Sequence, residues 1–293
     1  MNVLSVVIVS YNTKDLTLRC LKSINSLYKK ELENRKIEAI VVDNNSTDGT
    51  SLSIMELKEK VKGLILIQSK ENLGFAKACN IGAKVSKGKY ILFLNSDTEV
   101  EDRGFLLMAK YLEENPRIGI LGGRLENVDA TPQPSTGKFY NLFNLLIMLL
   151  GLERFGALRS SPTRIKRVDW VSGASMMVRR EVFDKLSGFD EKIFMYMEDM
   201  ELCFRADKMG FFTYYFPNIK LKHKSQGSSD RTFAIINIYK GILYFYSKHK
   251  SRFEYAIVKI FLVGKAEFLI LLGVLTFNSD LSNRYRKALA SNL

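Results

Sequence analysis

The sequence predicts an α/β protein with a mostly parallel central sheet and helices on both faces. In residues 1–125, short apolar runs alternate with stretches of helical periodicity. The apolar runs are continuous rather than alternating, which is typical of strands buried on both faces of a parallel sheet. Because 46% of the residues are hydrophobic, the chain can bury a substantial core, and disorder is not expected for most of it.

The elements of this first part follow from the same pattern. The predicted helix over residues 14–27, for example, carries Leu16, Cys20 and Ile24 on one face. Strands are expected over residues 3–9, 37–42, 64–67, 90–94 and 118–121. Further helices are expected over residues 51–61, 75–85 and 105–113.

Polar residues follow three of these strands at their carboxyl ends. They are Tyr11-Asn12, Asp43-Asn44 and Asn95-Ser96-Asp97. In open parallel sheets, ligands bind beyond the carboxyl ends of the strands. We therefore expect these side chains to gather along one edge of the sheet.

The second part of the chain changes character. Residues 126–167 are expected to form an insertion at the edge of the site, with a turn-rich loop, an apolar segment and basic residues. Beyond it we expect strands over 168–178 and 211–216 and helices over 180–186 and 197–209. The predicted main domain is 1–230, with halves 1–125 and 126–230, and a helical tail covers 231–293.

The tail contains an apolar run over residues 255–277 that raises the question of a membrane helix. Lys259, Lys265 and Glu267 interrupt it, at roughly 2.5–3.5 kcal/mol for each charge at the bilayer centre. We expect an amphipathic helix that lies on the membrane surface, helped by the basic stretch before it. The alternative is ordinary packing, against the main domain or in the interface of a homo-oligomer.

Charge and cysteine usage restrict the partners and the compartment. A net charge of +13 favours anionic partners. The basic residues cluster near the apolar tail rather than in a stripe with interleaved aromatics, so a nucleic acid partner is not expected. The three scattered cysteines fit a reducing cytosol. Since residues 1–10 read as a core strand rather than a signal peptide, we expect a cytoplasmic protein, peripheral on the inner face of the cell membrane.

Two phosphate-binding motifs are excluded. No GxGxxG follows the first predicted strand, which counts against a dinucleotide dehydrogenase. The segment Gly82 to Lys89 resembles a P-loop, but its spacing is one residue too long and Tyr90 stands where Ser or Thr is needed.

Two acidic sites about a hundred residues apart are the most informative feature of the sequence. Asp97 follows an apolar strand, and Glu198-Asp199 begins a helix among apolar residues. Isolated buried charge is costly unless a metal or a partner compensates it. A carboxylate that holds a cation and another that takes a proton would suit transfer of a group from a diphosphate leaving group. This interpretation requires the two acids to converge in one pocket.

Six segments, taken in order, resemble successive signatures of family 2 glycosyltransferases. They are Val7 to Asn12, Val41 to Thr50, Asn72 to Asn80, Leu94 to Thr98, Gly188 to Glu191 and Glu198-Asp199. The resemblance covers residues 3–225 and is closest to the rhamnosyltransferase-like branch. It implies a GT-A fold and an inverting enzyme that uses a nucleotide-sugar donor and a divalent metal, Mg²⁺ or Mn²⁺. The halves 1–125 and 126–230 would then bind nucleotide and acceptor.

The resemblance implies a set of donor-binding residues. They are Ser10, Tyr11, Asn12, Asp43, Asn44, Asn72, Asn80, Asn95 and Ser96. Asp43 can accept hydrogen bonds from a uracil or thymine N–H and from ribose, and Tyr11 with Asn12 can contact the base. The alternatives are a helix cap or Asx turn for Asp43, a simple turn for Tyr11-Asn12 and a helix cap for Asn72.

Asp97 and His223 are the candidate metal ligands. The Asp-x-Asp of the family appears here as Asn95-Ser96-Asp97, which leaves one carboxylate, so Glu99 or the donor phosphates would supply further ligands. His223 resembles a family histidine that ligates the same metal, and carboxylate plus imidazole suits Mn²⁺ as well as Mg²⁺. The alternatives are a helix-capping role for Asp97 and a polar surface role for His223.

Asp199 is the candidate general base, because a sugar hydroxyl must lose its proton as the new bond forms. Glu198 would hold the acceptor or tune Asp199 through like charge. The alternative is an acidic helix start stabilised by the helix dipole. Trp170 and Gly173 are expected in the acceptor wall, with Trp170 in the core as the alternative.

These expectations combine into one function. The chain would transfer a sugar, with rhamnose favoured by the resemblance, from a dTDP- or UDP-sugar donor to a glycan acceptor. The acceptor would be lipid-linked and belong to cell-surface polysaccharide synthesis, with a soluble or protein acceptor as the rival. A non-catalytic nucleotide-sugar-binding scaffold at the membrane is the alternative, against which the intact Asp97, Asp199 and His223 argue.

Overall fold

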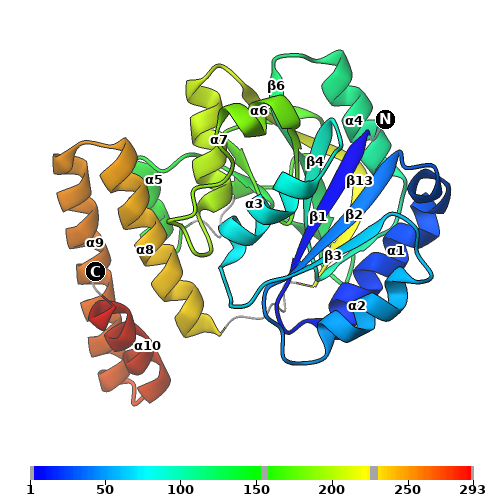
Figure 1. The fold of residues 1–293 in the computed structure, drawn as a ribbon. Helices are drawn as coiled ribbons and strands as arrows, with labels where there is room; N and C mark the ends of the chain where they lie inside the picture. The colour runs from blue at the N-terminus through cyan, green and yellow to red at the C-terminus, as the bar shows by residue number, and fades with distance from the viewer. Residues whose placement is uncertain (1–2, 153–157, 225–229, 292–293) are drawn as a thin grey trace.

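A central sheet with the strand order β10-β13-β6-β12-β4-β1-β2-β3 organises the protein (Figure 1). The computed structural model describes residues 3–152, 158–224 and 230–291. The main strands are β1 (Leu4–Ser10), β2 (Ile37–Asp43), β3 (Leu64–Gln68), β4 (Tyr90–Asn95), β6 (Ile118–Glu126), β10 (Lys166–Val168), β12 (Ser175–Arg179) and β13 (Phe212–His223). Short strands β5 (Thr98–Val100) and β7 (Pro132–Gln133) pair with β13 and β6.

Among these main strands, β12 and the edge strand β10, which pairs with β13, run antiparallel to their neighbours. Strands β3, β2, β1 and β4 are parallel, and β13 is parallel to β6. Strand β12 runs antiparallel between β4 and β6. A small second sheet joins β11 (Trp170–Val171), β8 (Thr136–Gly137) and β9 (Arg159–Ser160). The prediction of a mostly parallel α/β sheet is confirmed.

Helices cover both faces of the sheet, and each face has its own hydrophobic core. Val6 and Ile8 pack with α1 (Lys14–Glu33), α2 (Thr50–Lys58) and α4 (Gly104–Glu114). Val7 and Phe93 point the other way and pack with the helices α3 (Phe75–Val85), α6 (Arg180–Lys185) and α7 (Glu198–Lys208). This alternation explains why the strands are continuously apolar, since both faces of each strand are buried.

Several predicted boundaries were wrong, and packing explains the differences. Helix α1 continues six residues past Leu27 because Tyr28 and Leu32 are also buried, with the Tyr28 ring stacked on Phe105. The single strand predicted over 168–178 is broken, because the chain turns between Ser172 and Ser175. Strand β13 extends to His223 because β5 and β6 pair with its second half.

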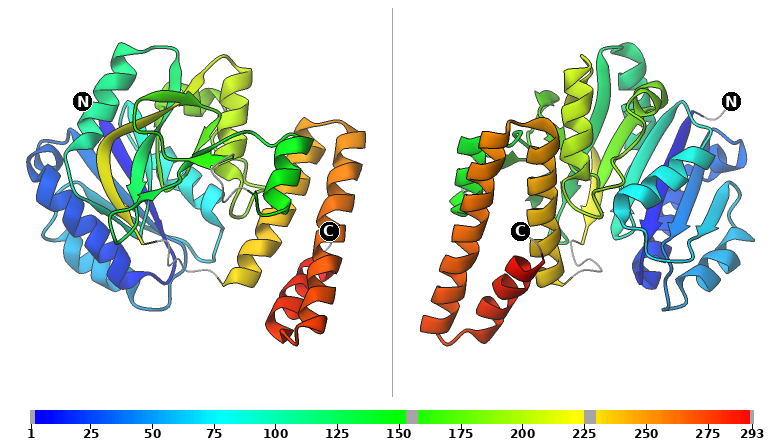
Figure 2. Two further views of the ribbon diagram at one scale, coloured as in Figure 1. Left: turned by 180° about the vertical axis from the view of Figure 1, so that it is seen from behind. Right: turned by 60° about the vertical axis from the view of Figure 1, so that its left-hand side comes forward.

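Three helices follow the sheet domain. They are α8 (Arg231–His249), α9 (Arg252–Leu275), which begins with a capping box, and α10 (Ser279–Ala290). Helix α8 is packed into the core of the sheet domain through Tyr239, Ile242, Phe245 and Tyr246. Helix α9 lies on the outer side of α8, and α5 (Leu142–Leu149) packs beside it (Figure 2).

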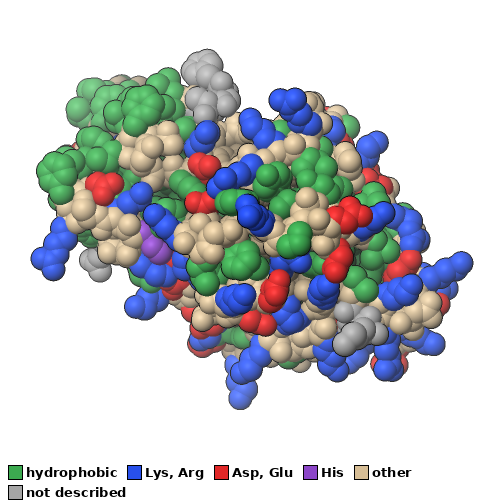
Figure 3. Space-filling model, turned by 90° about the horizontal axis from the view of Figure 1, so that it is seen from above, with side chains coloured by type: hydrophobic (Ala, Val, Ile, Leu, Met, Phe, Trp, Pro, Cys, Tyr) green, Lys and Arg blue, Asp and Glu red, His purple; other side chains and the backbone are tan. Residues whose placement is uncertain are grey.

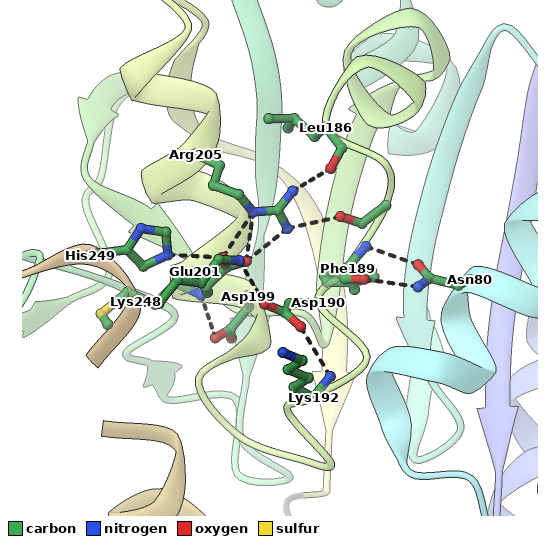
Figure 4. Close-up of polar contacts among 12 residues, drawn as sticks. Asn80, Leu186, Phe189, Asp190, Lys192, Asp199, Glu201, Arg205, Lys248 and His249 are labelled. Atoms are coloured by element: carbon green, nitrogen blue, oxygen red, sulfur yellow. Dashed lines mark hydrogen bonds and ion pairs between the residues drawn. The ribbon is translucent and has the colours of Figure 1, made fainter. Parts of the chain in front are cut away.

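A buried carboxylate joins α8 to α7 (Figure 4). Glu201 on α7 is fully buried and accepts hydrogen bonds from Arg205, from Lys248 Nζ at 2.8 Å and from His249 Nε2 at 3.0 Å. Burial by itself would raise the pKa of Glu201, but the hydrogen bonds from His249, Arg205 and Lys248 lower it to about 2. The charged network therefore stabilises the ionised form of Glu201, and with it the contact between the two helices.

Replacing Glu201 tests this contact. Because the folded-state pKa lies below the ordinary value of 4.5, the stabilisation is present above pH 4.5 and is lost as the pH falls toward 2. We expect Glu201→Gln to lower the free energy of unfolding at pH 7 by about 3 kcal/mol. Urea unfolding followed by circular dichroism at several pH values measures this difference, which should shrink below about pH 4.5.

Glu113→Gln is the matched control for this experiment. Glu113 also pairs with a lysine, Lys89, but both side chains are more than half exposed. Exposed pairs contribute little to stability, so its urea midpoint should stay close to that of the wild-type protein. A Glu201→Gln difference that does not change with pH would contradict the argument from Glu201 ionisation.

Candidate active site

The residues after β1, β2 and β4 meet at one edge of the sheet and line a cavity of about 400 Å³. Its walls include Tyr11, Asn44, Asn72, Asn95, Ser96 and Asp97. We call it the first cavity. A second cavity, of about 360 Å³, is lined by Trp170, Gly173, Glu198, Asp199 and His223 among others. Phe75, Asn95 and Met195 line both cavities, so the two adjoin, and the acids predicted from the sequence line neighbouring cavities rather than a single one.

Asn44 and Asn72 shape one wall of the first cavity. Asn44 Nδ2 donates to Asn72 Oδ1 at 2.8 Å, and the Leu73 N–H donates to Asn44 Oδ1 at 2.9 Å. The next residue, Gly74, has φ of 80°, and a Cβ there would lie 2.4 Å from the Phe194 carbonyl oxygen. Only glycine allows this close approach, which joins the loop before α3 to the loop before α7.

Asp97 and His223 lie together where the two cavities meet. Asp97 Oδ1 is 3.2 Å from His223 Nε2, and both side chains are largely buried. On the other side of the ring, His223 Nδ1 is 2.6 Å from Gln133 Oε1. Because an amide oxygen can only accept, Nδ1 donates to Gln133, and Nε2 is the ring nitrogen that faces Asp97 and the Asn95 amide nitrogen, the latter at 3.2 Å.

This arrangement fits a hard divalent cation. A carboxylate oxygen and an imidazole nitrogen face each other, and both atom types bind Mn²⁺ or Mg²⁺ when they carry no proton. Contacts on the far nitrogen of a metal-binding histidine commonly fix its orientation, as Gln133 does here. Among the described residues, no group of three or more His, Cys, Asp or Glu side chains is placed to hold a metal. A bound ligand would therefore have to complete the coordination.

Asp199 is held in the second cavity by two backbone N–H groups. Oδ2 accepts from Gly173 at 3.1 Å and Oδ1 accepts from Met200 at 2.7 Å. Burial raises the pKa of Asp199, while these two hydrogen bonds and the charge of Arg159 oppose the rise. A carboxylate with a raised pKa is a better proton acceptor than an ordinary one. Gly173 and Arg159 thus limit the rise in the pKa of the carboxylate that the sequence indicated.

Glu198 has a different environment from its neighbour. It is buried, and its Oε2 has no hydrogen-bond partner within the described part of the chain. Burial and the nearby charge of Asp199 raise the pKa of Glu198 to about 8. Glu198 therefore carries a proton at neutral pH while Asp199 accepts two N–H donors, which makes Asp199 the more easily ionised of the two.

An unusual turn leads into this pair of acids. Tyr196 and Met197 both have positive φ, 66° and 76°, and Met197 is the residue before α7. For residues other than glycine, such conformations are strained and persist only when surrounding contacts hold them. Nothing in the residue types Tyr and Met indicates a left-handed turn, so this turn could not be predicted from the sequence.

Four residues predicted to bind a donor make other contacts and do not line the first cavity. Ser10 is fully buried and shares hydrogen bonds with Thr13 and Thr17. Asn12 Oδ1 accepts from the Thr47 N–H at 2.8 Å, which ties the loop after β1 to the loop after β2.

The other two are Asp43 and Asn80. Asp43 accepts from the Ser46 N–H and the Ser51 hydroxyl, the turn-and-cap pattern that was its alternative. Asn80 lies on α3, apart from the first cavity, where its amide bonds the N–H and the carbonyl oxygen of Phe189 (Figure 4). In this structure Asn80 holds the Gly188–Glu191 loop, and Asp43 holds the loop before α2.

Trp170 is part of the core and also lines the second cavity. Its ring is largely buried and its Nε1–H donates to the Lys138 carbonyl oxygen at 3.0 Å, yet one part of it lines the second cavity. The guanidinium of Arg159 lies 5.5 Å from the ring centroid. Arg159, together with Asp230 and Phe233 in the first cavity, was missed by the sequence analysis. The basic character of the insertion was the only signal for Arg159.

Comparison with known proteins shows the family and the fold of the chain. Residues 5–187 match the model of Glycosyl transferase family 2. The chain is 27% identical over 250 residues to N-acetylglucosaminyl-diphospho-decaprenol L-rhamnosyltransferase of Mycobacterium tuberculosis, with 78% of each chain covered. It is 28% identical over 227 residues to rhamnosyltransferase WbbL of Escherichia coli K12, covering 74% of this chain and 82% of that relative.

Solved structures show the same fold. The mannosyltransferase PcManGT from Pyrobaculum calidifontis, in complex with GDP-Man and Mn²⁺, matches with a TM-score of 0.60 at 16% identity. The match covers 98% of this chain and 85% of that chain. The predicted GT-A fold is confirmed.

The raised pKa of Glu198 gives a test by stability. Since its folded-state pKa of about 8 exceeds the ordinary 4.5, the folded protein loses stability relative to the unfolded chain as the pH rises between these values. Glu198→Gln removes this loss. Its stability relative to wild type should therefore rise by up to about 1.4 kcal/mol per pH unit between pH 5 and 8.

Urea unfolding at pH 5, 6, 7 and 8 measures the trend, and Glu59→Gln, at an exposed position at the end of α2, is the control. A constant difference between Glu198→Gln and wild type across this range would mean that Glu198 is ionised in the folded protein.

Proposed function

The chain belongs to glycosyl transferase family 2 and is a glycosyltransferase, and we propose that it transfers rhamnose with inversion onto a lipid-linked glycan. One observation carries the proposal: Asp97 and Asp199, far apart in sequence, open into adjoining cavities that share Asn95. A carboxylate for a cation beside the leaving group and another for the attacking hydroxyl are what a single displacement needs. A silent binding scaffold would need no base.

We assign the first cavity to the donor, a dTDP- or UDP-sugar. It gathers an aromatic ring, Tyr11, and the amides of Asn44 and Asn72. These groups can contact a base and a ribose. The diphosphate would then reach Asp97, and the sugar would lie toward the second cavity. The choice of rhamnose is supported by the names of the two relatives, both rhamnosyltransferases.

We assign Mg²⁺ or Mn²⁺ to Asp97 and His223, with donor phosphate oxygens as the remaining ligands. When bound, the cation would neutralise charge that develops on the diphosphate as the sugar–oxygen bond breaks. The contribution of the chain is to hold the two ligands together. Gln133 orients the imidazole ring of His223 for this task.

The second cavity would hold the acceptor hydroxyl near Asp199. As that oxygen attacks the anomeric carbon, a carbon–oxygen bond forms on the face opposite the diphosphate, and the bond to the diphosphate breaks. Asp199 takes the proton of the hydroxyl. Attack from the opposite face inverts the anomeric centre. Trp170 offers an aromatic face to the acceptor sugar, and the Gly173 N–H fixes the Asp199 carboxylate.

Two substitutions separate these roles. Asp199→Asn should keep donor affinity but lower turnover by about 10²–10⁴-fold, because it removes the proton acceptor. Asp97→Ala should weaken donor binding in the presence of Mn²⁺ and have little effect without metal. Calorimetry measures donor binding, and released nucleoside diphosphate measures turnover.

The assay uses a panel of dTDP- and UDP-sugars with an N-acetylglucosaminyl-diphospholipid as acceptor. Equal loss of donor affinity in both variants would contradict the separation of the two sites. The absence of nucleoside diphosphate release with every donor would reject the proposed donors.

We also propose that the protein is peripheral on the inner face of the cell membrane. Hydrophobic side chains gather at the end of the molecule formed by the C-terminal helices, at the left of Figure 3. The apolar side chains most exposed on α5 and α9, including their ends, are Phe143, Leu150, Phe253, Ile260, Phe268, Leu271, Leu275 and Phe277. None of the helices that the structure describes is long and apolar enough to cross a bilayer. A surface of this kind suits contact with lipid.

Vesicle sedimentation tests the membrane proposal. Phe268 and Leu275 are 63% and 67% exposed, and replacing both by Gln should weaken binding to anionic phosphatidylglycerol vesicles by at least about tenfold. Leu52→Gln is the control, because Leu52 is 65% exposed but lies on α2. If the double variant changes the sedimentation coefficient and leaves vesicle binding intact, the surface joins two copies of the chain instead.

A further inference from the structure

Helix α8 runs along both cavities, although it follows the sheet domain in sequence. Phe233 near its start lines the first cavity together with Asp230, the residue before the helix. Ile238, one turn further along, lines the second cavity. Figure 1 shows α8 between the sheet domain and α9. A segment that the sequence indicated as a tail thus forms part of the walls around both acids.

Gly241 on α8 lies directly against the strained turn. A Cβ built on Gly241 would lie 2.8 Å from Met197 Cγ, 3.0 Å from Met197 Cβ and 3.1 Å from the Tyr196 carbonyl oxygen. Real Cβ atoms are almost never found closer than 3.0 Å to another heavy atom. A hydrogen atom in place of a side chain is therefore what lets α8 lie directly against Tyr196 and Met197.

The face of α8 that carries Gly241 also packs along α7. Residues 241, 245, 248 and 249 follow helical spacing, so they lie on one side of the helix. The Phe245 ring centroid is 5.1 Å from that of Phe204 on α7. Lys248 and His249 then bind Glu201, as Figure 4 shows. Helix α8 thus contacts both the start of α7 and its second turn.

The position of Asp199 depends on the contacts that hold the start of α7 in place. Asp199 lies two residues after Met197, and its carboxylate must stay within reach of the Gly173 N–H. Two consecutive residues with positive φ, neither of them glycine, do not keep this conformation by themselves, because free residues of these types favour negative φ. A contact that fixes the turn therefore fixes the direction of the Asp199 side chain.

We propose that Gly241 is a positioning residue for the reaction: through it, α8 holds the Tyr196–Met197 turn and so aims the Asp199 carboxylate at the acceptor. This inference rests on the proposed role of Asp199 as the base. Gly241 touches no substrate and acts only through the turn. A larger residue at 241 would push α8 and the turn apart and displace the base.

Two helical glycines make the test a matched pair. Alanine favours a helix more than glycine does, so neither Gly241→Ala nor Gly264→Ala should unfold its helix. A Cβ at Gly264 on α9 would meet nothing within 4 Å. We expect Gly241→Ala to lower kcat roughly 10–100-fold with the donor KM unchanged, and Gly264→Ala to match wild type in both.

A second substitution links the effect to the turn. Met197→Gly removes the Cβ and Cγ that an alanine at 241 would meet, and glycine accepts positive φ. The Tyr196 carbonyl oxygen, at 3.1 Å, is then the one contact of these three that remains, so Gly241→Ala should lower kcat clearly less in that background than in the wild-type protein. If its full effect persists beside Met197→Gly, or if Gly241→Ala alone keeps wild-type kcat, the inference is overturned.

Hydrogen exchange measured by mass spectrometry separates this inference from the proposed function. Amides of residues 194–201 should exchange faster in Gly241→Ala than in wild type or Gly264→Ala, whether or not a donor sugar is known. Unchanged exchange there would reject the positioning role even in an active enzyme. Faster exchange in a protein that releases no nucleoside diphosphate would instead leave the contact standing and reject the function.

Discussion

The register between neighbouring parallel strands is the constraint on which the site depends. Ser10 at the end of β1 pairs with Asp43 at the end of β2, and Val9 pairs with Asn95 at the end of β4. Because the three strands stop at the same level, the residues that follow them must turn at one edge. A slip of one residue in any pair would exchange the faces of that strand and destroy both cores. Core packing and the placement of polar residues are thus fixed together.

The antiparallel strand β12 joins this edge to the second carboxylate. It begins at Ser175, opposite Leu94, so the turn before it arrives where β4 ends. The Asn95 N–H donates to the Ala174 carbonyl oxygen, and the adjacent Gly173 N–H binds Asp199. Two hydrogen bonds therefore connect the strand that leads to Asp97 with the helix that carries Asp199. The backbone fixes the distance between the Gly173 N–H and the Ala174 carbonyl oxygen, so the distance between these two hydrogen bonds can vary little.

The sequence predicted the sheet well because its signal is local. Continuous apolar runs, with Val6 and Val7 buried on opposite faces, are visible without knowing any partner. Asp97 and His223 were paired only through the family resemblance. The Asp43–Ser51 contact is the local alternative that the sequence offered, whereas the contact of Asn80 with Phe189, 109 residues away, is one that no local pattern reveals. The role of α8 was hidden for the same reason, since its periodicity fits a membrane surface and a protein surface equally well.

The place of α8 has a consequence for engineering hybrids between relatives. Phe233 and Ile238 are walls of the cavities, and Lys248 and His249 donate hydrogen bonds to the buried Glu201 carboxylate. A crossover made where the sheet ends would combine the base of one parent with the α8 of another, and the Glu201 carboxylate would keep only Arg205 as a partner from its own parent. A crossover at Lys250-Ser251, in the break before α9, would exchange the outer helices and keep the catalytic unit whole.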